Sequence, residues 1–535
     1  MLPAPDALVV ARSAAPGRAG GRNPRGPGGL RPLRAPTSHV LALVAVASLS
    51  CCGRQQAGSG ETLTIAARAD VTGFHPNPPM RNESYTFAIN RAIYDPLVVF
   101  DGAYRLEPHL AARWESPDER TYVFELRDDV RFSDGQPLTA RDVAASISAA
   151  LERGWPVKDY LQAISSVKAV GPRRVEIRTA GSNLTLLTRL PWGYVSPASA
   201  VDQTPVPVVG SGPYRLESWS PGEQFVLVRN EHYWGPRPHF ARVRYLVVPD
   251  DEERVAMVER GAAQMADHVP LDQLDRLETR AGLRLVVSSG HRVLFLGLRL
   301  DTPPFADPRV REAIDLAIDR RELIERALFG RAEPGAQIVP RGIVGYNPRI
   351  RPVPPDRVRA RALLAEAGFP NGFATRLEGT ANRYVNDVQL LHEVARQLAG
   401  VGIRAQPDPQ DKSVFFPLVD AGRSPFHLLG WASETGDAGD AIQFLAHTPA
   451  GSRMGRLNTT AISDPGIDAS YAAADAASSV VERSRHLQEA LARIAALRAM
   501  LPLVVQTQAV VHTTRVEWDP PVNAVIHPGE VRRAR

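Results

Sequence analysis

The length of the chain constrains its fold more than any other feature. Its 535 residues exceed the ~250–300 at which a single hydrophobic core stops growing, so we expect at least two lobes. Hydrophobic residues make up 44% and charged residues 23%, a balance that is typical of globular proteins and unlike that of disordered chains. The composition therefore supplies enough apolar material for more than one core.

Strand and helix patterns mix along the whole chain, which predicts the α/β class. Residues 121–126 (TYVFEL) alternate with period two, as a half-buried strand does. Asp307-Pro308 joins a capping acid to a proline at the first helical position, which predicts the start of a helix. Asp319 is expected to cap a continuation of this helix, and Gly330 to end it. Further strands are expected near 61–70, 174–178, 224–230 and 243–248, and further helices near 83–93, 140–151, 356–367, 385–400 and 480–500.

The positive charge of the chain belongs to its N-terminal segment. Residues 1–51 hold six arginines and the single acid Asp6, so this segment carries a charge of +5, the same as the net charge of the whole chain. The remaining residues sum to zero, whereas a nucleic-acid-binding protein carries its positive charge on the folded surface. We therefore expect no nucleic-acid partner.

The N-terminal segment has the layout of an export signal. Val40–Leu49 is a ten-residue apolar run that follows a basic stretch and is shorter than the ~20 residues needed to span a bilayer. The run ends in Leu-Ser-Cys-Cys, which resembles a bacterial lipobox with Cys52 as the lipidated residue. Cys51 as the acceptor, a plain signal peptide and an inert hydrophobic tail are the alternatives. We expect residues 1–51 to be the signal and 52–60 a tether, with the protein membrane-anchored in the periplasm or at the cell surface.

Motifs for catalysis and metal binding are missing from the sequence. It has no GxSxG, no GxxxxGK[ST], no CxxC and no GxGxxG. His392-Glu393 begins a zinc-protease pattern, but Arg396 stands where the second histidine is needed. We therefore expect no enzyme activity, no metal and no cofactor, and keep an exported hydrolase only as a remote alternative.

Six short motifs follow one another along the chain: IYDPLV (93–98), LEPHLAARW (106–114), FELRDDVRFSDGQPLTARDV (124–143), GSGPY (210–214), PRVREAI (308–314) and ALLAEAG (362–368). In sequence and in order they resemble the motifs of the extracellular solute-binding proteins, family 5, which include the dipeptide- and oligopeptide-binding proteins of ABC importers. The resemblance covers the chain from about residue 61 to residue 535.

The resemblance implies a two-lobed class II periplasmic binding-protein fold with an extra subdomain. Lobe I would consist of residues 61–100, 210–300 and 501–535. The extra subdomain would cover residues 101–209 and lobe II residues 301–500. Most residues of these motifs form turns and pack the core, and they identify the family rather than contact a ligand.

The resemblance also implies a function. The protein, expected to be a monomer, would capture a peptide or peptide-like solute between its lobes by hinge closure and deliver it to an ABC permease in the inner membrane. The alternative is the same fold with a non-peptide solute such as a nickel chelate, haem, glutathione or an oligosaccharide, because a fold does not fix its ligand.

Six residues are the candidates for ligand binding. Glu434, which follows Gly430-Trp431, falls where peptide-binding relatives place an acid for the ligand amine. Arg383 falls near their carboxylate-binding arginine, whose planar guanidinium suits a carboxylate. Trp431 could offer a flat wall, and Phe74, His75 and Tyr94 fall in the early ligand-proximal region. For each of them, surface exposure or core packing is the competing interpretation.

Overall fold

The computed structural model describes residues 62–76, 84–102, 105–155, 157–181, 183–433, 435–451, 454–521 and 524–535. All of them belong to one compact unit, Ala57–Arg535. The predicted export signal, the tether, the lipidation site Cys52 and the candidate Glu434 lie outside the described residues. Within the described part, no helix combines the length and the apolar character needed to cross a membrane.

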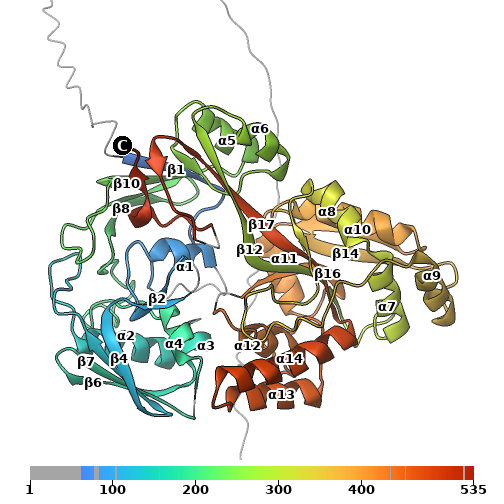
Figure 1. Cartoon of the computed structure of the whole chain (residues 1–535), viewed down its shortest axis with the longest axis horizontal. Coiled ribbons are helices and arrows are strands. Elements are labelled where there is room, and N and C mark those ends of the chain that lie inside the picture. Colours follow the sequence, from blue (N-terminus) through green and yellow to red (C-terminus); the bar gives the residue numbers. More distant parts are fainter. Residues whose placement is uncertain are drawn as a thin grey trace, which may run out of the picture. The chain divides into compact units, whose positions relative to one another are not determined.

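A large mixed sheet runs through the molecule (Figure 1). Its strands, in spatial order, are β15 (Arg404–Gln410), β14 (Ala374–Thr380), β16 (Phe426–Ala432), β12 (Leu283–Leu298), β17 (Met500–Thr513), β11 (Met265–Ala266), β1 (Thr62–Ala67), β10 (Arg242–Val247), β9 (Gln224–Arg229) and β8 (Tyr214–Ser220), and β13 (Glu333–Pro334) also pairs with β17. β1 is parallel to β10 and β11, and β14 is parallel to β15 and β16.

The long antiparallel strands β12 and β17 connect the two halves of this sheet. The first part of β12 pairs only with β17, whereas Arg292–Leu298 of β12 pair with β16, and Val293–Gly297 among them keep β17 on their other side. β17 in turn pairs with β11. We call the part built on β1 and β8–β11 the first lobe, the part built on β14–β16 the second lobe, and β12 and β17 the crossing strands. The expected two-lobed α/β architecture is confirmed.

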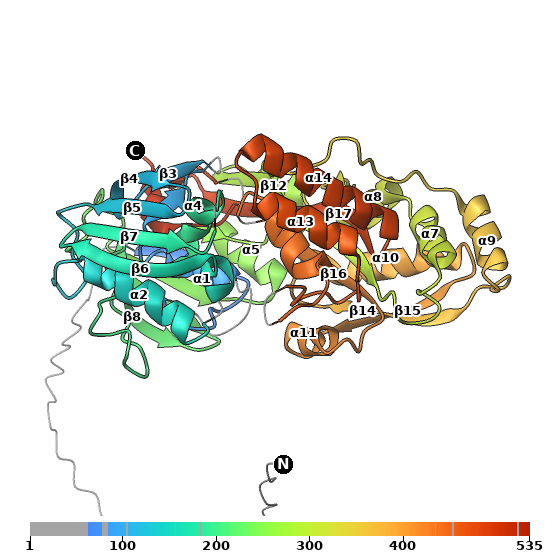
Figure 2. The same ribbon diagram turned by 90° about the horizontal axis from the view of Figure 1, so that it is seen from below.

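A second sheet extends the first lobe. It has the order β4 (Ala111–Asp118), β5 (Thr121–Leu126), β7 (Arg174–Thr179) and β6 (Ile164–Gly171), and helix α2 (Ala140–Glu152) packs against β6 and β7 (Figure 2). Near it lie β2 (Val98–Phe100), β3 (Leu106–Pro108), α1 (Ser84–Asn90), α3 (Lys158–Leu161), α4 (Leu186–Arg189) and the 3-10 turn η1 (Leu190–Trp192). This sheet lies within the predicted extra subdomain, whose exact boundaries, like those of the lobes, stay a prediction.

The remaining helices cover the second lobe and the crossing strands, and the first of them also packs on β1 and β11 of the first lobe. They are α5 (Asp251–Glu259), α6 (Leu274–Glu278), α7 (Pro308–Ala317), α8 (Arg320–Leu328), α9 (Arg357–Glu366), α10 (Asp387–Ala399), α11 (Lys412–Asp420), α12 (Gly439–Ala441), the π-helical turn η3 (Ile442–Ala446), α13 (Pro465–Asp475) and α14 (Val480–Leu497). Short elements complete the chain: η2 (Leu271–Gln273), β18 (Val516–Glu517), η4 (Pro528–Glu530) and β19 (Arg532–Arg533).

Local sequence signals place the ends of several helices as predicted. The carboxylate of Asp307 accepts a hydrogen bond from the backbone N–H of Arg309 at 2.8 Å, and Asp319 caps α8 through the N–H groups of Arg321 and Glu322. The long C-terminal helix ends at Leu497 and not near 500, because Met500 already begins β17.

The GSGPY turn needs glycine because of close packing and not because of its backbone dihedral angles. Neither Gly210 nor Gly212 has a positive φ. A Cβ atom at Gly210 would instead lie 2.0 Å from the carbonyl oxygen of Ile93. Close approach of two backbone segments therefore requires glycine at this position.

Candidate functional site

A cavity of about 560 Å³ lies where the two lobes and the crossing strands meet. Its volume is within the roughly 300–1,000 Å³ range of small-molecule sites. Its lining includes Tyr85, Phe87, Arg91, Trp192, Tyr194, His268, His527 and Glu530 of the first lobe, Gly290, His291, Arg292 and Gln508 of the crossing strands, and Arg383 and Ala432 of the second lobe. A solute held here contacts both lobes.

A bulge in β12 forms the floor of the cavity. Pairing with β17 is regular up to Ser289, opposite Thr507, and resumes at Val293, opposite Val505. The extra residues 290–292 leave the regular ladder, as residues of a bulge do. The carbonyl of His291 accepts a hydrogen bond from the N–H of Ser433 at 3.2 Å, which ties the end of β16 to the bulge.

Two arginines flank one buried tyrosine on the second-lobe side of the cavity. The guanidinium carbons of Arg292 and Arg383 lie 5.7 Å and 5.8 Å from the ring centre of Tyr384, within cation–π range. The Tyr384 hydroxyl accepts a hydrogen bond from the N–H of Gly430 at 2.9 Å. The buried carboxylate of Asp387 accepts from the N–H of Arg383 at 3.0 Å and so fixes the loop that carries this arginine. This side of the cavity suits an anionic group.

A polar cluster of the first lobe faces the cavity from another side. A guanidinium nitrogen of Arg91 lies 3.2 Å from Nε2 of His527, and another lies 3.6 Å from Oε1 of Glu530. Burial lowers the pKa of His527 well below its usual value and raises the pKa of Glu530. Neutral His527 can accept a hydrogen bond from Arg91, so this cluster holds its own charges in balance.

The two lobes also contact each other directly beside the cavity. Arg456 of the second lobe forms an ion pair of 2.8 Å with Asp159 of α3, and its guanidinium carbon lies 5.4 Å from the ring centre of Phe444. A guanidinium nitrogen of Arg189 in α4 donates a hydrogen bond of 3.4 Å to Gln443 of η3. These contacts join helices near the second sheet of the first lobe to the turn η3 of the second lobe.

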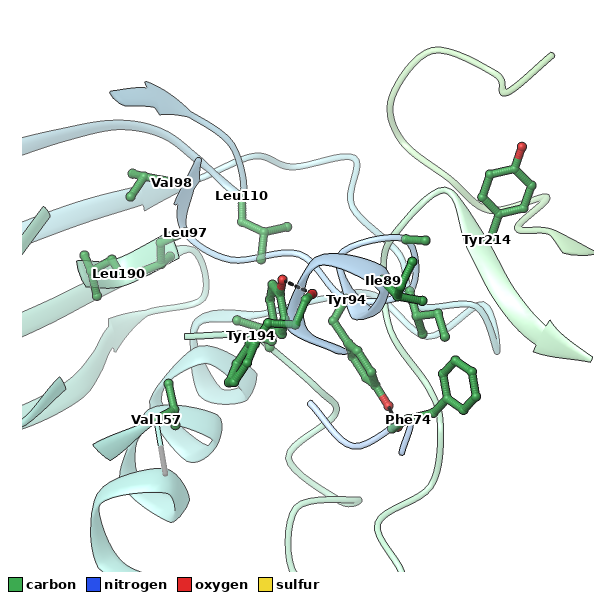
Figure 3. Close-up of a cluster of buried hydrophobic side chains, with 14 of the residues drawn as sticks. Phe74, Ile89, Tyr94, Leu97, Val98, Leu110, Val157, Leu190, Tyr194 and Tyr214 are labelled. Carbon is green, nitrogen blue, oxygen red and sulfur yellow. Dashed lines mark hydrogen bonds between the residues drawn. The ribbon is translucent and has the colours of Figure 1, made fainter. Parts of the chain in front are cut away.

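Arg383 is the one predicted ligand-binding residue that lines this cavity among those the structure describes. The ring of Trp431 is buried; its Nε1 donates to Asp440 at 3.4 Å, although the next residue, Ala432, lines the cavity. Phe74 and Tyr94 lie in the core of the first lobe, where the Tyr94 hydroxyl donates to the carbonyl of Phe74 at 2.9 Å (Figure 3). The ring of His75 packs edge to face on that of Trp155. The binding roles of all of them, and of Glu434, stay predictions.

Arg292 and Trp192 also line the cavity, although neither is predicted from the sequence. Arg292 owes its place to the bulge between two strands that are far apart in the sequence, and Trp192 lies in a three-residue helical turn. Neither has a local sequence signal for a ligand site.

Comparisons with known proteins identify a family, a set of relatives and a fold. The model of the middle region of bacterial extracellular solute-binding proteins, family 5, matches residues 105–453. The glutathione-binding protein GsiB of Escherichia coli K12 is 29% identical over 424 residues, which are 76% of this chain and 82% of that protein. The periplasmic binding protein DppA of Helicobacter pylori, in complex with the peptide STSA, superposes with a TM-score of 0.80 at 23% identity over 89% of this chain and 98% of its own. NikA of Brucella suis, in complex with Fe(III)-EDTA, superposes with a TM-score of 0.79 at 22% identity over 88% of this chain and 99% of its own.

Proposed function

The chain belongs to the bacterial extracellular solute-binding proteins, family 5, and from this premise we propose that it captures peptides or peptide-like solutes between its lobes for an ABC importer. The observation that carries the proposal is the cavity lined by both lobes, with Arg292 and Arg383 on one side and the Arg91–Glu530 cluster on another. A zwitterionic peptide needs a cation for its carboxylate and an anion for its amine, together with polar partners between them.

The proposed mechanism is hinge closure. The crossing strands are the shared chain segments on which the two lobes move, and the bulge at 290–292 interrupts their ladder at the cavity. A solute that contacts both lobes stabilises the conformation in which they approach, because only contacts that differ between the two conformations shift their balance.

We assign the end groups of the solute to two residues. Arg383 binds the ligand carboxylate with its guanidinium at the cavity wall. Glu434 binds the ligand amine; its neighbours Ser433 and Thr435 are buried, and the N–H of Ser433 donates to the carbonyl of His291 in the bulge. Glutathione, the solute in the name of the relatives, is a peptide-like candidate ligand.

The cellular part of the proposal rests on the leader sequence. Lipid attached to Cys52 anchors the protein at the membrane, and residues 52–60 give it the reach to meet its permease. Membership of this family supports a location in the periplasm, where we propose that the anchored protein acts as a monomer.

The test combines variants of the protein with modified ligands. The purified chain is first examined by native mass spectrometry for co-purifying solutes, and peptide affinities are then measured by isothermal titration calorimetry. Arg383→Ala should weaken binding of a peptide with a free carboxylate at least tenfold, because truncating one partner of a buried charge pair costs about 2–5 kcal/mol. It should leave binding of the C-terminally amidated peptide nearly unchanged. Arg404→Ala, on exposed β15, is the matched control.

The same design applies to the amine. Glu434→Gln should weaken the free peptide at least tenfold and leave the N-acetylated peptide nearly unchanged. A metal complex or a glycan as the co-purifying solute, together with no measurable affinity for peptides or glutathione, would refute the proposed ligand class.

A further inference from the structure

One side of the cavity is aromatic, in contrast to the arginine side. It is lined by Tyr85 and Phe87 of α1 and by Trp192 and Tyr194 at and after η1. The ring of Trp192 is half-buried, so part of its surface remains open to the cavity. This gives the site an apolar surface opposite in character to its charged groups.

The ring of Trp192 is held from two directions. It stacks on Tyr160 with ring centres 4.9 Å apart and an interplanar angle of 13°, and it meets Phe87 edge to face at 5.1 Å and 74°. The backbone around it is tied as well, because the hydroxyl of Tyr194 donates to the carbonyl of Phe87 at 2.7 Å. A rigid ring offers its face to a ligand without losing conformational freedom on binding.

Trp192 also belongs to the contacts that join the lobes. The ring centre of Tyr160, on which Trp192 stacks, lies 6.2 Å from the ring centre of Phe444 of the second lobe. Asp159, the neighbour of Tyr160, pairs with Arg456, which lies over the same Phe444 ring. A group that packs on Trp192 therefore rests on an aromatic stack that reaches both lobes.

The charged and aromatic sides together orient a peptide. An apolar side chain placed against Arg292 and Arg383 would desolvate two cations without replacing their hydrogen bonds. The same side chain placed on Trp192 buries apolar surface and makes favourable ring contacts. The end groups of the ligand thus belong on the arginine side, and its side chain on the aromatic side.

We propose that Trp192 is a specificity-determining residue, which selects peptides that carry an aromatic or branched apolar side chain. This inference rests on the proposed capture of peptides. Burial of such a side chain on Trp192 gives an affinity at least tenfold higher than that of the same peptide with glycine in its place.

The experiment is calorimetric titration of tripeptides with identical end groups that carry glycine, leucine or phenylalanine at each position in turn. The wild-type chain should prefer phenylalanine or leucine over glycine at least tenfold at one position. Trp192→Ala should abolish this preference and change the affinity for triglycine less than about threefold. Trp192→Phe should keep most of the preference. Trp219→Ala is the matched control, since Trp219 is a partly exposed tryptophan of the first lobe that does not line the cavity.

The outcomes separate this inference from the proposed function. Peptide binding without side-chain preference in the wild type, or an equal loss for all peptides in Trp192→Ala, overturns the role of Trp192 and leaves peptide capture intact. Absence of binding for every peptide overturns both. Thermal unfolding shows whether Trp192→Ala is folded; if it is not, Trp192→Leu replaces it and should reduce the preference for phenylalanine at least threefold.

Discussion

The ion pair between Asp159 and Arg456 gives a direct test of lobe closure. Its atoms are 2.8 Å apart and its side chains are 18% and 11% exposed, so it is better shielded from water than an ordinary surface pair. Asp159 belongs to the first lobe and Arg456 to the second. We predict that Asp159→Asn, which removes the charge and keeps the shape, weakens ligand binding although neither residue lines the cavity.

The magnitude follows from the geometry. Two unit charges about 3 Å apart attract each other by roughly 5 kcal/mol at an effective dielectric constant of ~20. Desolvation offsets most of this, so exposed pairs contribute about 0.2–1 kcal/mol, while breaking a fully buried pair costs about 3–5 kcal/mol. A pair of intermediate exposure should contribute about 1–2 kcal/mol. If the liganded conformation requires this contact and the ligand-free conformation does not, Kd rises about five- to thirtyfold.

A double-mutant cycle measures this coupling. Ligand affinity is determined by calorimetry for the wild type, Asp159→Asn, Arg456→Gln and the double variant. The loss caused by Asp159→Asn should largely disappear in the Arg456→Gln background. Asp128→Asn is the control, because Asp128 pairs with Arg173 at 3.0 Å within the first lobe and both are well exposed. An unchanged Kd in Asp159→Asn, or full additivity of the two single variants, would refute the assignment of this pair to closure.

Two further predictions concern stability. Burial, with Asp437 nearby, raises the pKa of Asp440 to about 7, so the folded protein keeps a proton that the unfolded chain releases above about pH 4. The free energy of unfolding should therefore fall by a few kcal/mol as the pH rises from about 4 to 7. Asp440→Asn should remove this pH dependence, as measured by urea unfolding at pH 5 and pH 8. Gly210→Ala should lower the unfolding free energy by about 3 kcal/mol or more, because the new Cβ atom would meet Ile93. Gly181→Ala is the control: it has open space around it and should change the unfolding free energy by less than about 1 kcal/mol. Equal effects of the two variants would contradict the close-approach explanation.

The fold could be predicted from the sequence wherever the signals are local. The strand over 121–126 and the caps Asp307 and Asp319 depend on residues within one turn or one strand, and the structure confirms them. The two-lobed architecture came from the resemblance, since no periodicity indicates which strands cross between lobes.

The cavity could be predicted only in part, because its lining comes from distant segments. Arg383 could be predicted from its place in the family resemblance. Arg292, in contrast, reaches the cavity through the pairing of β12 with β17, whose paired segments lie about 200 residues apart. The resemblance also suggests Tyr94 for the cleft. Its side chain is fully buried instead, because its hydroxyl is satisfied by the carbonyl of Phe74 inside the apolar core.

In the proposed mechanism, recognition and closure use the same pieces of chain. The bulge at 290–292 interrupts the crossing strands on which we propose that the lobes move, and it also places Arg292 in the cavity wall. Tyr160 supports Trp192 at the aromatic side and touches Phe444 of the second lobe. A solute that engages both sides therefore acts on the hinge through the bulge and on the lobe contact through the stack. Binding energy gained at either end of the solute favours the conformation in which the lobes meet, which couples the choice of solute to closure without a separate signalling element.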